Sequence, residues 1–303
     1  MAVLKNGIWY PDESADALTH EDTFSAEILP ETGRYHLYVS GACPFAHRPW
    51  LVIQALGLKD AISVSSVAAV RDDNGWAFSE ENPDPVNHEV WLHSLYVRTA
   101  ADFTGRVSVP VLWDKQEQRV VCNDSAKLAA TLATDWFPFA HNKTELIPES
   151  RAREIGDLNT WLHQNINRRV YQAGFATTQQ DYDREVHVLF DALQMLNDRL
   201  ETSLYLCGEE ITLPDLFLFP SLVRFETVYA VHFRANIRPL SSFTALYRYM
   251  LNLLAQEALR ETVHMDHIHR HYYLSHRHIN PSGIIPAGPR PAWIKEYGLM
   301  NQT

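Results

Sequence analysis

Residues 35–58 read YHLYVSGACPFAHRPWLVIQALGL, and this stretch decides the fold of the first half of the chain. The alternation and the β-forming residues from Tyr35 to Ser40 predict a strand. A Gly-Ala pair then breaks the run, and the apolar spacing from Trp50 to Leu58 predicts a helix. Cys43 lies at the turn between them. Pro44 suits the first position of the helix, because its missing N–H would have no intrahelical partner there.

The position of Cys43 predicts a reactive thiol. Free N–H groups and the positive end of a helix dipole stabilise a thiolate, and His47 and Arg48 can add positive charge. The alternative is a buried, inert cysteine, as most lone cysteines are. The coincidence of strand, turn, Cys-Pro and helix favours a nucleophile.

The chain has no second cysteine near Cys43. Ala46 stands where a C-x-x-C oxidoreductase would carry its resolving cysteine, and Cys122 and Cys207 are distant in sequence. A mixed disulfide on Cys43 would therefore be resolved by a thiol from solution, which indicates a small-thiol cosubstrate.

Composition limits the class of protein. The 303 residues suffice for two domains, and the net charge of −11 disfavours nucleic-acid binding. No apolar run reaches the ~18 residues of a membrane-spanning helix, and no signal peptide is evident. Three cysteines at unrelated spacings fit a reducing compartment, so we expect a cytoplasmic protein.

A β-α-β unit opens the first domain, which we place at residues 34–135 after an extended lead-in over 1–33. Residues 61–70 read as a second strand, parallel to the first. Residues 71–105 show no regular pattern, and a connection of that length usually has a function or is disordered.

A β-hairpin is predicted over residues 106–114 and 119–122. Pro110 lies within its first strand, where proline cannot donate to the sheet, and a cis Val109–Pro110 bond resolves this conflict. Such a bend would leave the Val109 backbone available to an extended ligand. An ordinary edge-strand proline is the alternative.

Asp124 and Ser125 open the next predicted helix. A helix start of this kind binds carboxylates well, although simple helix capping also explains both residues.

The second half of the chain shows helical patterns. Residues 136–150 are predicted as a linker, 151–263 as an all-α domain and 264–303 as a tail without clear periodicity. Thr212 and Asp215 form a capping box, and Pro220 is expected to kink or end its helix. The helices are predicted at 151–169, 179–201, 212–225 and 243–259.

This arrangement resembles the glutathione transferase superfamily, and within it the xi-type glutathionyl-hydroquinone reductases. The resemblance implies a thioredoxin-like N-terminal domain joined to an all-helical C-terminal domain. It covers nearly the whole chain. The matching segments are GRYHLYVSGACPFAHR at 33–48, NGWAF at 74–78, GRVSVPVLWDK at 105–115, VYQAGFATTQQDYD at 170–183, YLCGEEITLPDLFLFPSLVRF at 205–225 and HIHRHYYLSH at 267–276.

The resemblance also implies roles for particular residues. Cys43 matches the catalytic cysteine, and Tyr171 and Tyr272 would lie in an aromatic pocket, where a phenol can hydrogen-bond a hydroquinone oxygen. The tail would pack near the active site. Glutathione would be held by Trp76, Arg106, Val109, Asp124 and Ser125. Plain structural roles remain open for each of the aromatic residues and for Arg106.

The chain departs from the family pattern at two positions. Phe45 follows Cys-Pro where the family usually has Trp, and Asp124 stands where it usually has Glu. Both changes keep the chemistry and alter the reach, so they bear on substrate fit. Arg98 is a rival to Arg106 for contact with glutathione.

The reaction implied is glutathione-dependent reduction of a glutathionyl-hydroquinone through a mixed disulfide on Cys43, by a homodimer and without a metal. One alternative is an omega-like thioltransferase or dehydroascorbate reductase, and another is a non-catalytic interaction module on the same fold. A third is a zinc site in the tail, although its spacing fits no regular zinc pattern. That site would use His264, His267, His269, His271, His276, His278 and Asp266.

Overall fold

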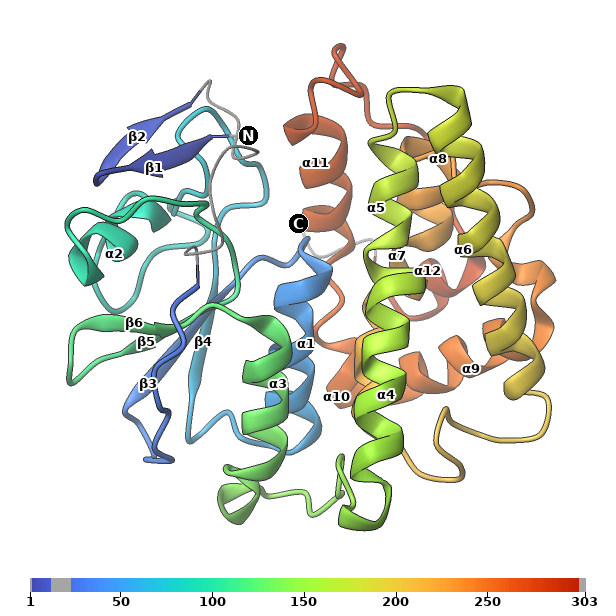
Figure 1. The fold of residues 1–303 in the computed structure, drawn as a ribbon, viewed down its shortest axis with the longest axis horizontal. Coiled ribbons are helices and arrows are strands. Elements are labelled where there is room, and N and C mark those ends of the chain that lie inside the picture. Colours follow the sequence, from blue (N-terminus) through green and yellow to red (C-terminus); the bar gives the residue numbers. More distant parts are fainter. Residues whose placement is uncertain (1, 12–22, 300–303) are drawn as a thin grey trace. The chain divides into compact units, whose positions relative to one another are not determined.

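The computed structural model describes residues 2–11 and 23–299, and the chain divides into two compact units (Figure 1). The first unit is Met1–Asn142 and the second is Lys143–Thr303. The division falls within the segment 136–150. Among the described residues, no helix is long and apolar enough to cross a membrane.

A four-stranded sheet forms the centre of the first unit, in the order β4-β3-β5-β6. β3 pairs in parallel with β4 and antiparallel with β5, and β6 is antiparallel to β5. Every residue of β3 is buried. The strands are β3 (Tyr35–Val39), β4 (Ser63–Ser66), β5 (Val111–Asp114) and β6 (Arg119–Cys122).

The sheet confirms the predicted parallel pair and the hairpin, but two strands are shorter than predicted. β4 covers four residues of the predicted 61–70. β5 begins only at Val111, because the cis bond before Pro110 turns the chain and proline offers no N–H to a neighbouring strand.

Three helices accompany this sheet: α1 (Pro44–Ala55), α2 (Leu92–Thr99) and α3 (Ser125–Thr134). α1 and α3 lie side by side (Figure 1). α2 lies in the stretch 71–105, which we predicted to be irregular, and that prediction was wrong for this part. Its buried residues Leu92, Leu95 and Tyr96 have helical spacing, but the helix is short and has no side-chain cap.

The lead-in is more regular than predicted. β1 (Val3–Lys5) and β2 (Ile8–Tyr10) form an antiparallel hairpin. Leu4 and Gly105 exchange two backbone hydrogen bonds of 2.9 Å, which join the hairpin to the body of the unit. Part of the predicted lead-in, residues 12–22, lies outside the described residues.

The second unit confirms the all-α prediction over its described residues. Its helices are α4 (Ala152–Leu162), α5 (Arg169–Gly174), α6 (Gln179–Arg199), α7 (Leu213–Arg224), α8 (Ala230–His232), α9 (Thr244–Ala255), α10 (Glu257–Arg260), α11 (Met265–Ser275) and α12 (Ala292–Glu296). Two π-helical turns interrupt them: η4 (His163–Asn167) follows α4, and η5 (Phe225–Tyr229) follows α7.

The capping box at the start of α7 is present, as predicted. Asp215 is buried and accepts hydrogen bonds from the N–H groups of Leu206 and Thr212 and from the Tyr249 hydroxyl. α7 continues past Pro220 to Arg224, so the expectation that Pro220 could end the helix was wrong. Every residue of α7 is buried, which makes it the central helix of this unit.

The tail contains a helix that the sequence pattern did not reveal. We predicted no clear periodicity over 264–303, yet α11 buries Met265, Ile268 and Tyr272 at spacings of three and four. Three histidines lie between these residues and obscure the apolar stripe.

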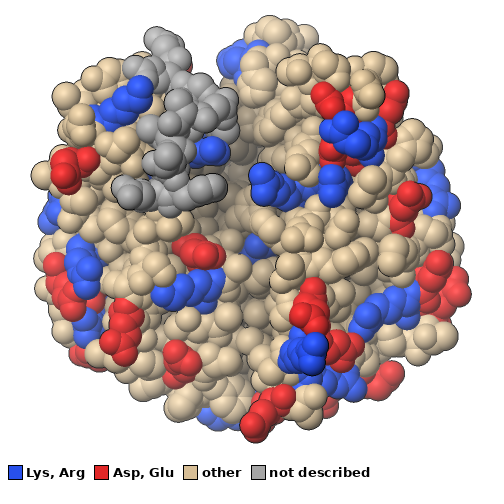
Figure 2. All heavy atoms as spheres, in the orientation of Figure 1, with Lys and Arg blue, Asp and Glu red and all other residues tan. Residues whose placement is uncertain are grey.

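Charged side chains of both signs are interspersed on the face drawn in Figure 2. Ion pairs in the described part of the chain include Arg184 with Asp181 at 2.7 Å and Arg199 with Glu154 at 2.7 Å. The net charge of −11 is therefore not gathered in a single patch on that face.

Candidate active site

Cys43 is the N-cap of α1, with Pro44 at the first helical position, as predicted. Its Sγ accepts a hydrogen bond from the Ala46 N–H at 3.5 Å. A sulfur at this place interacts with the positive end of the helix dipole, which favours the thiolate. His47 and Arg48 are both buried, and the Arg48 guanidinium lies 4.9 Å from the centre of the Phe45 ring.

Exposure separates Cys43 from the other two cysteines. Cys43 is half-buried, whereas Cys122 and Cys207 are buried. Burial raises the pKa of both buried thiols, which keeps them protonated. Of the three, Cys43 alone combines access with a helix start, and a catalytic role for it stays a prediction.

The loop before β5 lies beside this thiol. The Val109–Pro110 peptide is cis, which confirms the prediction, and the Val109 carbonyl oxygen is 3.8 Å from Cys43 Sγ. Val109 is buried, at 6% exposed. The arrangement brings an extended backbone next to a nucleophile.

Tyr96 holds this loop in place, and sequence reasoning missed it because α2 was not predicted. Its hydroxyl donates to the Ser108 carbonyl at 2.8 Å and accepts from the Ser108 N–H at 3.2 Å. Asn123 Nδ2 also donates to that hydroxyl at 3.3 Å. One buried phenol therefore fixes the residue immediately before Val109.

Arg71 was also missed, since it lies in a stretch without a pattern. Burial lowers the pKa of Arg71, and the charge of Cys43 acts in the opposite direction. The guanidinium and the sulfur are therefore close enough to interact electrostatically. Arg71 also lies over Trp76, with its Cζ 5.9 Å from the ring centre.

The remaining predicted glutathione contacts also lie in the first unit. Trp76 is 6% exposed, and its carbonyl accepts from the Leu92 N–H at 2.9 Å, which ties it to the start of α2. Arg106 is exposed. Arg98, its rival, is bound to Glu89 at 3.3 Å and Gln118 at 3.1 Å, so its guanidinium is already engaged.

Asp124 caps α3. Its Oδ1 accepts from the N–H groups of Ala126 at 2.8 Å and Lys127 at 3.1 Å. The structural explanation for Asp124 therefore holds. A ligand role for Asp124 and Ser125 stays a prediction.

In the second unit, three tyrosine hydroxyls meet. Tyr171 on α5 and Tyr272 on α11 are hydrogen-bonded through their hydroxyls, and Tyr229 in η5 contacts the Tyr272 hydroxyl at 3.3 Å. Tyr272 is 1% exposed and burial raises its pKa far above the ordinary value. Tyr171 is half-buried, so it is the accessible end of this chain of hydroxyls.

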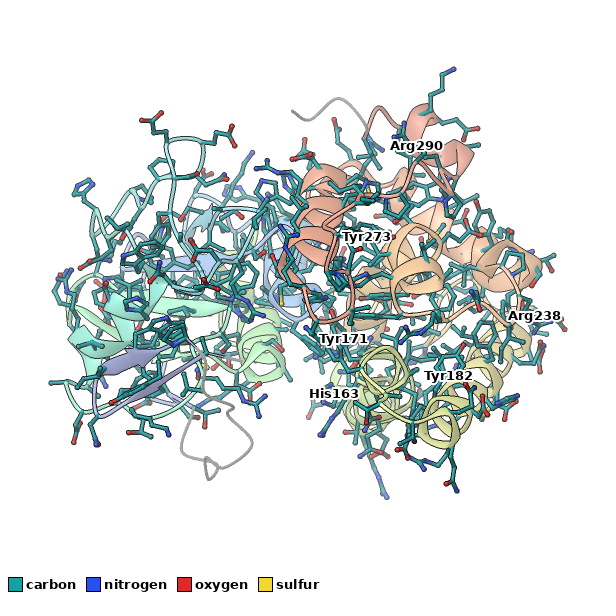
Figure 3. The ribbon with its side chains drawn as sticks, turned by 90° about the horizontal axis from the view of Figure 1, so that it is seen from above. His163, Tyr171, Tyr182, Arg238, Tyr273 and Arg290 are labelled. Atoms are coloured by element: carbon teal, nitrogen blue, oxygen red, sulfur yellow. The ribbon has the colours of Figure 1, made fainter. Side chains whose placement is uncertain are left out.

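Aromatic rings from several helices surround the tyrosines. Phe233 stacks on Tyr229 at 5.6 Å and meets Tyr171 edge to face at 5.2 Å. His232 Nε2 and His276 Nδ1 are 3.2 Å apart, and burial is the main cause that lowers the pKa of His232 to about 4. Figure 3 shows Tyr171 on α5 and Tyr273 on α11, on neighbouring helices of this unit.

The two π-helical turns adjoin this cluster. η4 ends just before α5, which carries Tyr171, and η5 ends at Tyr229. Asn167 in η4 is buried and donates to the Phe217 carbonyl at 3.0 Å and to Ser221 Oγ at 2.8 Å, which fastens η4 to α7. Such turns are common at functional sites because they re-aim the side chains that follow.

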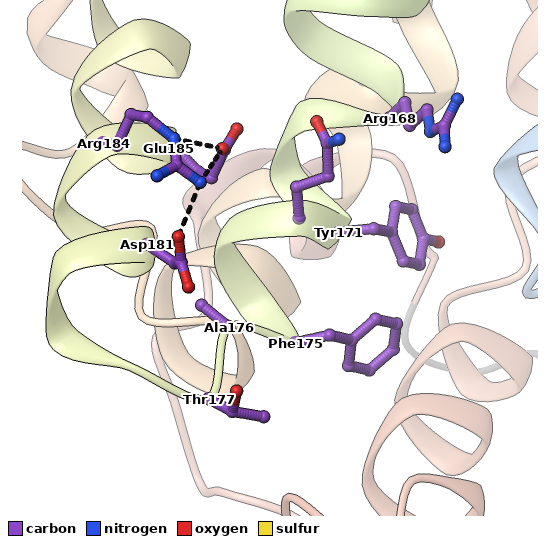
Figure 4. A pocket seen from close by; sticks show the side chains of 9 residues that line it. Arg168, Tyr171, Phe175, Ala176, Thr177, Asp181, Arg184 and Glu185 are labelled. Carbon is purple, nitrogen blue, oxygen red and sulfur yellow. Dashed lines mark hydrogen bonds and ion pairs between the residues drawn. The ribbon is translucent and has the colours of Figure 1, made fainter. Parts of the chain in front are cut away.

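A cavity of about 520 Å³ opens beside Tyr171 within this unit (Figure 4). Its lining combines aromatic and charged side chains. The lining residues are Arg168, Tyr171, Gln172, Phe175, Ala176, Thr177, Asp181, Arg184 and Glu185.

The histidines of the tail do not assemble a metal site in the described part of the chain. There, no group of three or more His, Cys, Asp or Glu side chains is placed to hold a metal ion. His276 faces His232, and His271 and His276 pack ring against ring at 5.2 Å. The zinc hypothesis therefore gains no support.

These features define a class of protein. A thioredoxin-like unit with a cysteine at a helix start beside a cis-proline, followed by an all-helical unit, is the architecture that the sequence predicted for a cysteine-type glutathione transferase. Two family profiles agree: the glutathione S-transferase N-terminal domain matches residues 42–135, and the C-terminal domain matches 179–251.

Proteins of similar sequence indicate which group of glutathione transferases the chain resembles. The chain is 38% identical over 271 residues to the glutathionyl-hydroquinone reductase YqjG of Escherichia coli, covering 88% of this chain and 83% of that one. It is 37% identical over 302 residues to the glutathionyl-hydroquinone reductase PcpF of Sphingobium chlorophenolicum, covering 95% and 96%.

Solved structures agree. A xi-class glutathione transferase from Natrialba magadii superposes with a TM-score of 0.92 at 39% identity, covering 96% of this chain and 94% of that one. The glutathione-bound structure of Escherichia coli YqjG gives 0.89 at 34%, covering 95% and 96%. The chain belongs to the xi-type glutathionyl-hydroquinone reductase family of the glutathione transferase superfamily. The predicted family and fold class are confirmed.

Proposed function

We propose that this chain reduces glutathionyl-hydroquinones to hydroquinones, with glutathione as cosubstrate and a Cys43–glutathione mixed disulfide as intermediate. The observation that carries the proposal is the half-buried Cys43 sulfur at the start of α1, 3.8 Å from the Val109 carbonyl of the cis-proline loop. Relatives named glutathionyl-hydroquinone reductases, and a glutathione-bound structure among them, support it.

In the first half-reaction the Cys43 thiolate attacks the sulfur of the substrate. An S–S bond forms and the bond from that sulfur to the ring carbon breaks. Because an aryl carbanion is too unstable to leave, the ring carbon is protonated through the keto tautomer of the hydroquinone. A phenol positioned at the ring oxygen assists this step.

In the second half-reaction a glutathione thiolate attacks the mixed disulfide on Cys43. Oxidised glutathione leaves and the Cys43 thiolate is restored. The two steps convert one glutathionyl-hydroquinone and one glutathione into hydroquinone and oxidised glutathione. Both steps depend on an ionised cysteine, which the start of α1 favours.

Tyr171 and Tyr272 have different parts in this proposal. Tyr171 is half-buried and can reach a substrate oxygen, so we assign it the contact. Tyr272 is buried and bonded to the Tyr171 hydroxyl, so it acts by orienting that phenol. Glutathione would lie against Trp76 and Val109 in the first unit.

Asp124 and Ser125 would meet the γ-glutamyl end of glutathione and Arg106 a carboxylate, because a helix start and a guanidinium both favour anions. Aromatic conjugates as substrates, a homodimeric assembly and a cytoplasmic location complete the proposal.

Mass spectrometry tests the central step. Wild-type protein exposed to a glutathionyl-hydroquinone should gain one glutathione adduct, located on Cys43 and removed by added glutathione. Cys43→Ser should gain none, while Cys122→Ser should behave as wild type because Cys122 is buried. An adduct on Cys122 or Cys207, or turnover by Cys43→Ser, would sink the proposal.

A second candidate is an omega-like thioltransferase. It is favoured by a 36% identity over 273 residues to the protein named glutathione S-transferase omega-like 2 of Schizosaccharomyces pombe, covering 86% of this chain and 87% of that one. The same Cys43 chemistry would then act on a simple mixed disulfide or on dehydroascorbate. Comparing kcat/KM for a glutathionyl-hydroquinone and a simple mixed disulfide decides between the two.

A further inference from the structure

One face of α5, with Arg168 and Phe175 at its two ends, lines the 520 Å³ cavity of the second unit. Arg168, Tyr171, Gln172 and Phe175 recur at spacings of three and four, so they share one side of the helix. Figure 4 shows Arg168, Tyr171 and Phe175 projecting from this helix toward the same side. Two aromatic rings and one guanidinium thus project from the same side of this helix.

The charged side chains that α6 contributes to the lining neutralise one another. Arg184 pairs with Asp181 at 2.7 Å and with Glu185 at 2.9 Å (Figure 4). Glu185 also pairs with Arg169. These interactions lower the pKa of Glu185 against the opposing effect of its burial, so the carboxylate stays ionised. The positive and negative charges of this network therefore balance one another.

Arg168 differs from that network. Among the described residues its guanidinium has no hydrogen bond or ion pair, and its side chain is exposed. A solvated arginine would need no explanation on an open surface, but this one stands at a cavity, one helical turn from the accessible tyrosine. The uncompensated charge of the lining is therefore positive.

We infer that Arg168, together with the rings of Tyr171 and Phe175, forms a subsite for hydroquinones that carry an acidic ring substituent. The inference rests on the proposed function and specifies its substrate class. The volume is that of a small-molecule site. The rings contact the aromatic nucleus, and the planar guanidinium binds a carboxylate with two hydrogen bonds.

A carboxylate can come from two sources, the ring substituent or the glutathione part of the conjugate. The two are separated by ligands without glutathione. The probes are 2,5-dihydroxybenzoate and its methyl ester, which share the hydroquinone ring and differ in the charge. Binding is measured by titration calorimetry on the full chain.

We expect the acid to bind more tightly than the ester to wild-type protein, and this preference to weaken as salt is added. Arg168→Gln should lower the preference about fivefold, the scale of one partly exposed ion pair. Arg168→Lys should restore part of it. Arg153→Gln is the matched control, since Arg153 is 96% exposed and lies on α4 outside this cavity.

Equal affinities for acid and ester, or a preference that survives Arg168→Gln, would overturn the inference. Turnover of glutathionyl conjugates is measured separately on the same variants. Wild-type protein that prefers the acid but does not turn over glutathionyl conjugates would contradict the proposed function and leave the subsite. If Arg168→Gln instead lowers the turnover of acidic and neutral conjugates equally, Arg168 binds the glutathione part and the inference is wrong.

Discussion

At the residue scale, Arg71 is the cation through which the first unit can tune Cys43. The interaction is mutual, because a thiolate that stabilises a guanidinium is stabilised by it. Arg71→Gln should therefore shift the pH profile of Cys43 alkylation by iodoacetamide upward by about one pH unit. The rate at neutral pH should fall accordingly.

The control for this variant is Arg98→Gln. Arg98 belongs to the same unit but is engaged with Glu89 and Gln118. Its removal should leave the alkylation profile where it is. A profile that moves equally in both variants would mean that the unit's overall charge, and not Arg71, acts on the sulfur.

Tyr272 gives a second test at this scale. Tyr272→Phe keeps the ring and removes the hydroxyl that orients Tyr171. We expect kcat to fall about tenfold, the scale of one strong hydrogen bond, with glutathione affinity nearly unchanged. Steady-state kinetics and glutathione titration measure the two quantities.

Tyr273 on the same helix is the matched control. Its hydroxyl donates to the Thr227 carbonyl at 2.8 Å, outside the chain of three tyrosines. Tyr273→Phe should lower thermal stability and leave kcat intact. Loss of glutathione affinity in Tyr272→Phe would show that Tyr272 has been assigned the wrong ligand.

At the scale of elements, the N-terminal hairpin braces the loop that carries Trp76. Trp9 on β2 donates from Nε1 to the Asp73 carbonyl at 2.8 Å and stacks on His93 at 4.9 Å. Gly75 has φ +83°, and a Cβ there would lie 2.8 Å from the Trp9 ring, so the two approach as closely as glycine permits.

Removing this brace should weaken the binding of glutathione and leave the rate of the chemical step little changed. Trp9→Ala should raise the KM for glutathione about fivefold, as expected for ~1 kcal/mol of lost positioning, with kcat little changed. Trp9→Phe should recover part of the affinity. Ile8→Ala, at a residue 60% exposed on the same strand, should change neither constant. An unchanged KM in Trp9→Ala would refute the brace.

Close packing of α5 gives a second prediction for an element. A Cβ on Gly174 would lie 2.3 Å from Cγ of Phe233, a ring that also packs on Tyr171. Gly174→Ala should destabilise the protein by ~1–3 kcal/mol and reduce kcat, because the displaced ring disturbs the tyrosine.

Gly156 in α4 is the contrasting position, since a Cβ there meets nothing within 4 Å. Gly156→Ala should stabilise the protein by ~0.5–1 kcal/mol, because alanine lowers the conformational entropy of the unfolded chain. Thermal denaturation measures both variants. The idea fails if the two substitutions shift Tm in the same direction.

The elements also show what the sequence could predict. The Cys-Pro helix start, the cis-proline and the Thr212 capping box were predicted, because each rests on a local rule that few residues satisfy. Arg71 and Tyr96 were not, because their roles come from neighbours distant in sequence: Cys43 lies 28 positions from Arg71 in the chain. The apolar stripe of α11 was not predicted, because histidines interrupt it in the sequence. In the structure these histidines pack against other rings.

At the scale of the whole molecule, buried neutral histidines link stability to pH in both units. Burial is the main cause that lowers the pKa of His36, His232 and His264 to about 4. Between pH 6.5 and 4 the unfolded chain binds protons that the folded chain does not. Stability is therefore complete above about pH 6.5 and falls as pH drops toward 4.

The ionised carboxylates affect stability over a lower range of pH than the histidines do. Hydrogen bonds lower the pKa of Asp84 and Asp114 against the effect of burial, so their stabilisation is lost only as pH falls below the ordinary range of a carboxyl group. A loss of stability between pH 6.5 and 5 is thus assigned to histidine.

His36 allows this assignment to be tested in one unit. Its ring nitrogens contact Ser63 Oγ at 2.7 Å and Ser65 Oγ at 2.8 Å, while Asp84 and Lys115 act on its charge in opposite directions. Each histidine of this kind can contribute on the order of 3 kcal/mol across its window. Calorimetry from pH 7.5 to 4.5 should show a wild-type Tm that is constant down to about pH 6.5 and falls below it.

His36→Gln keeps a polar side chain between the two serines and removes the titration. Its Tm should be lower at pH 7.5, because the fit to both hydroxyls is poorer, but it should fall less steeply with acid. His141→Gln is the control, since that side chain is 71% exposed. Equal slopes in wild type and His36→Gln would place the acid sensitivity of the first unit elsewhere, because glutamine at position 36 cannot bind the proton that histidine takes up on unfolding.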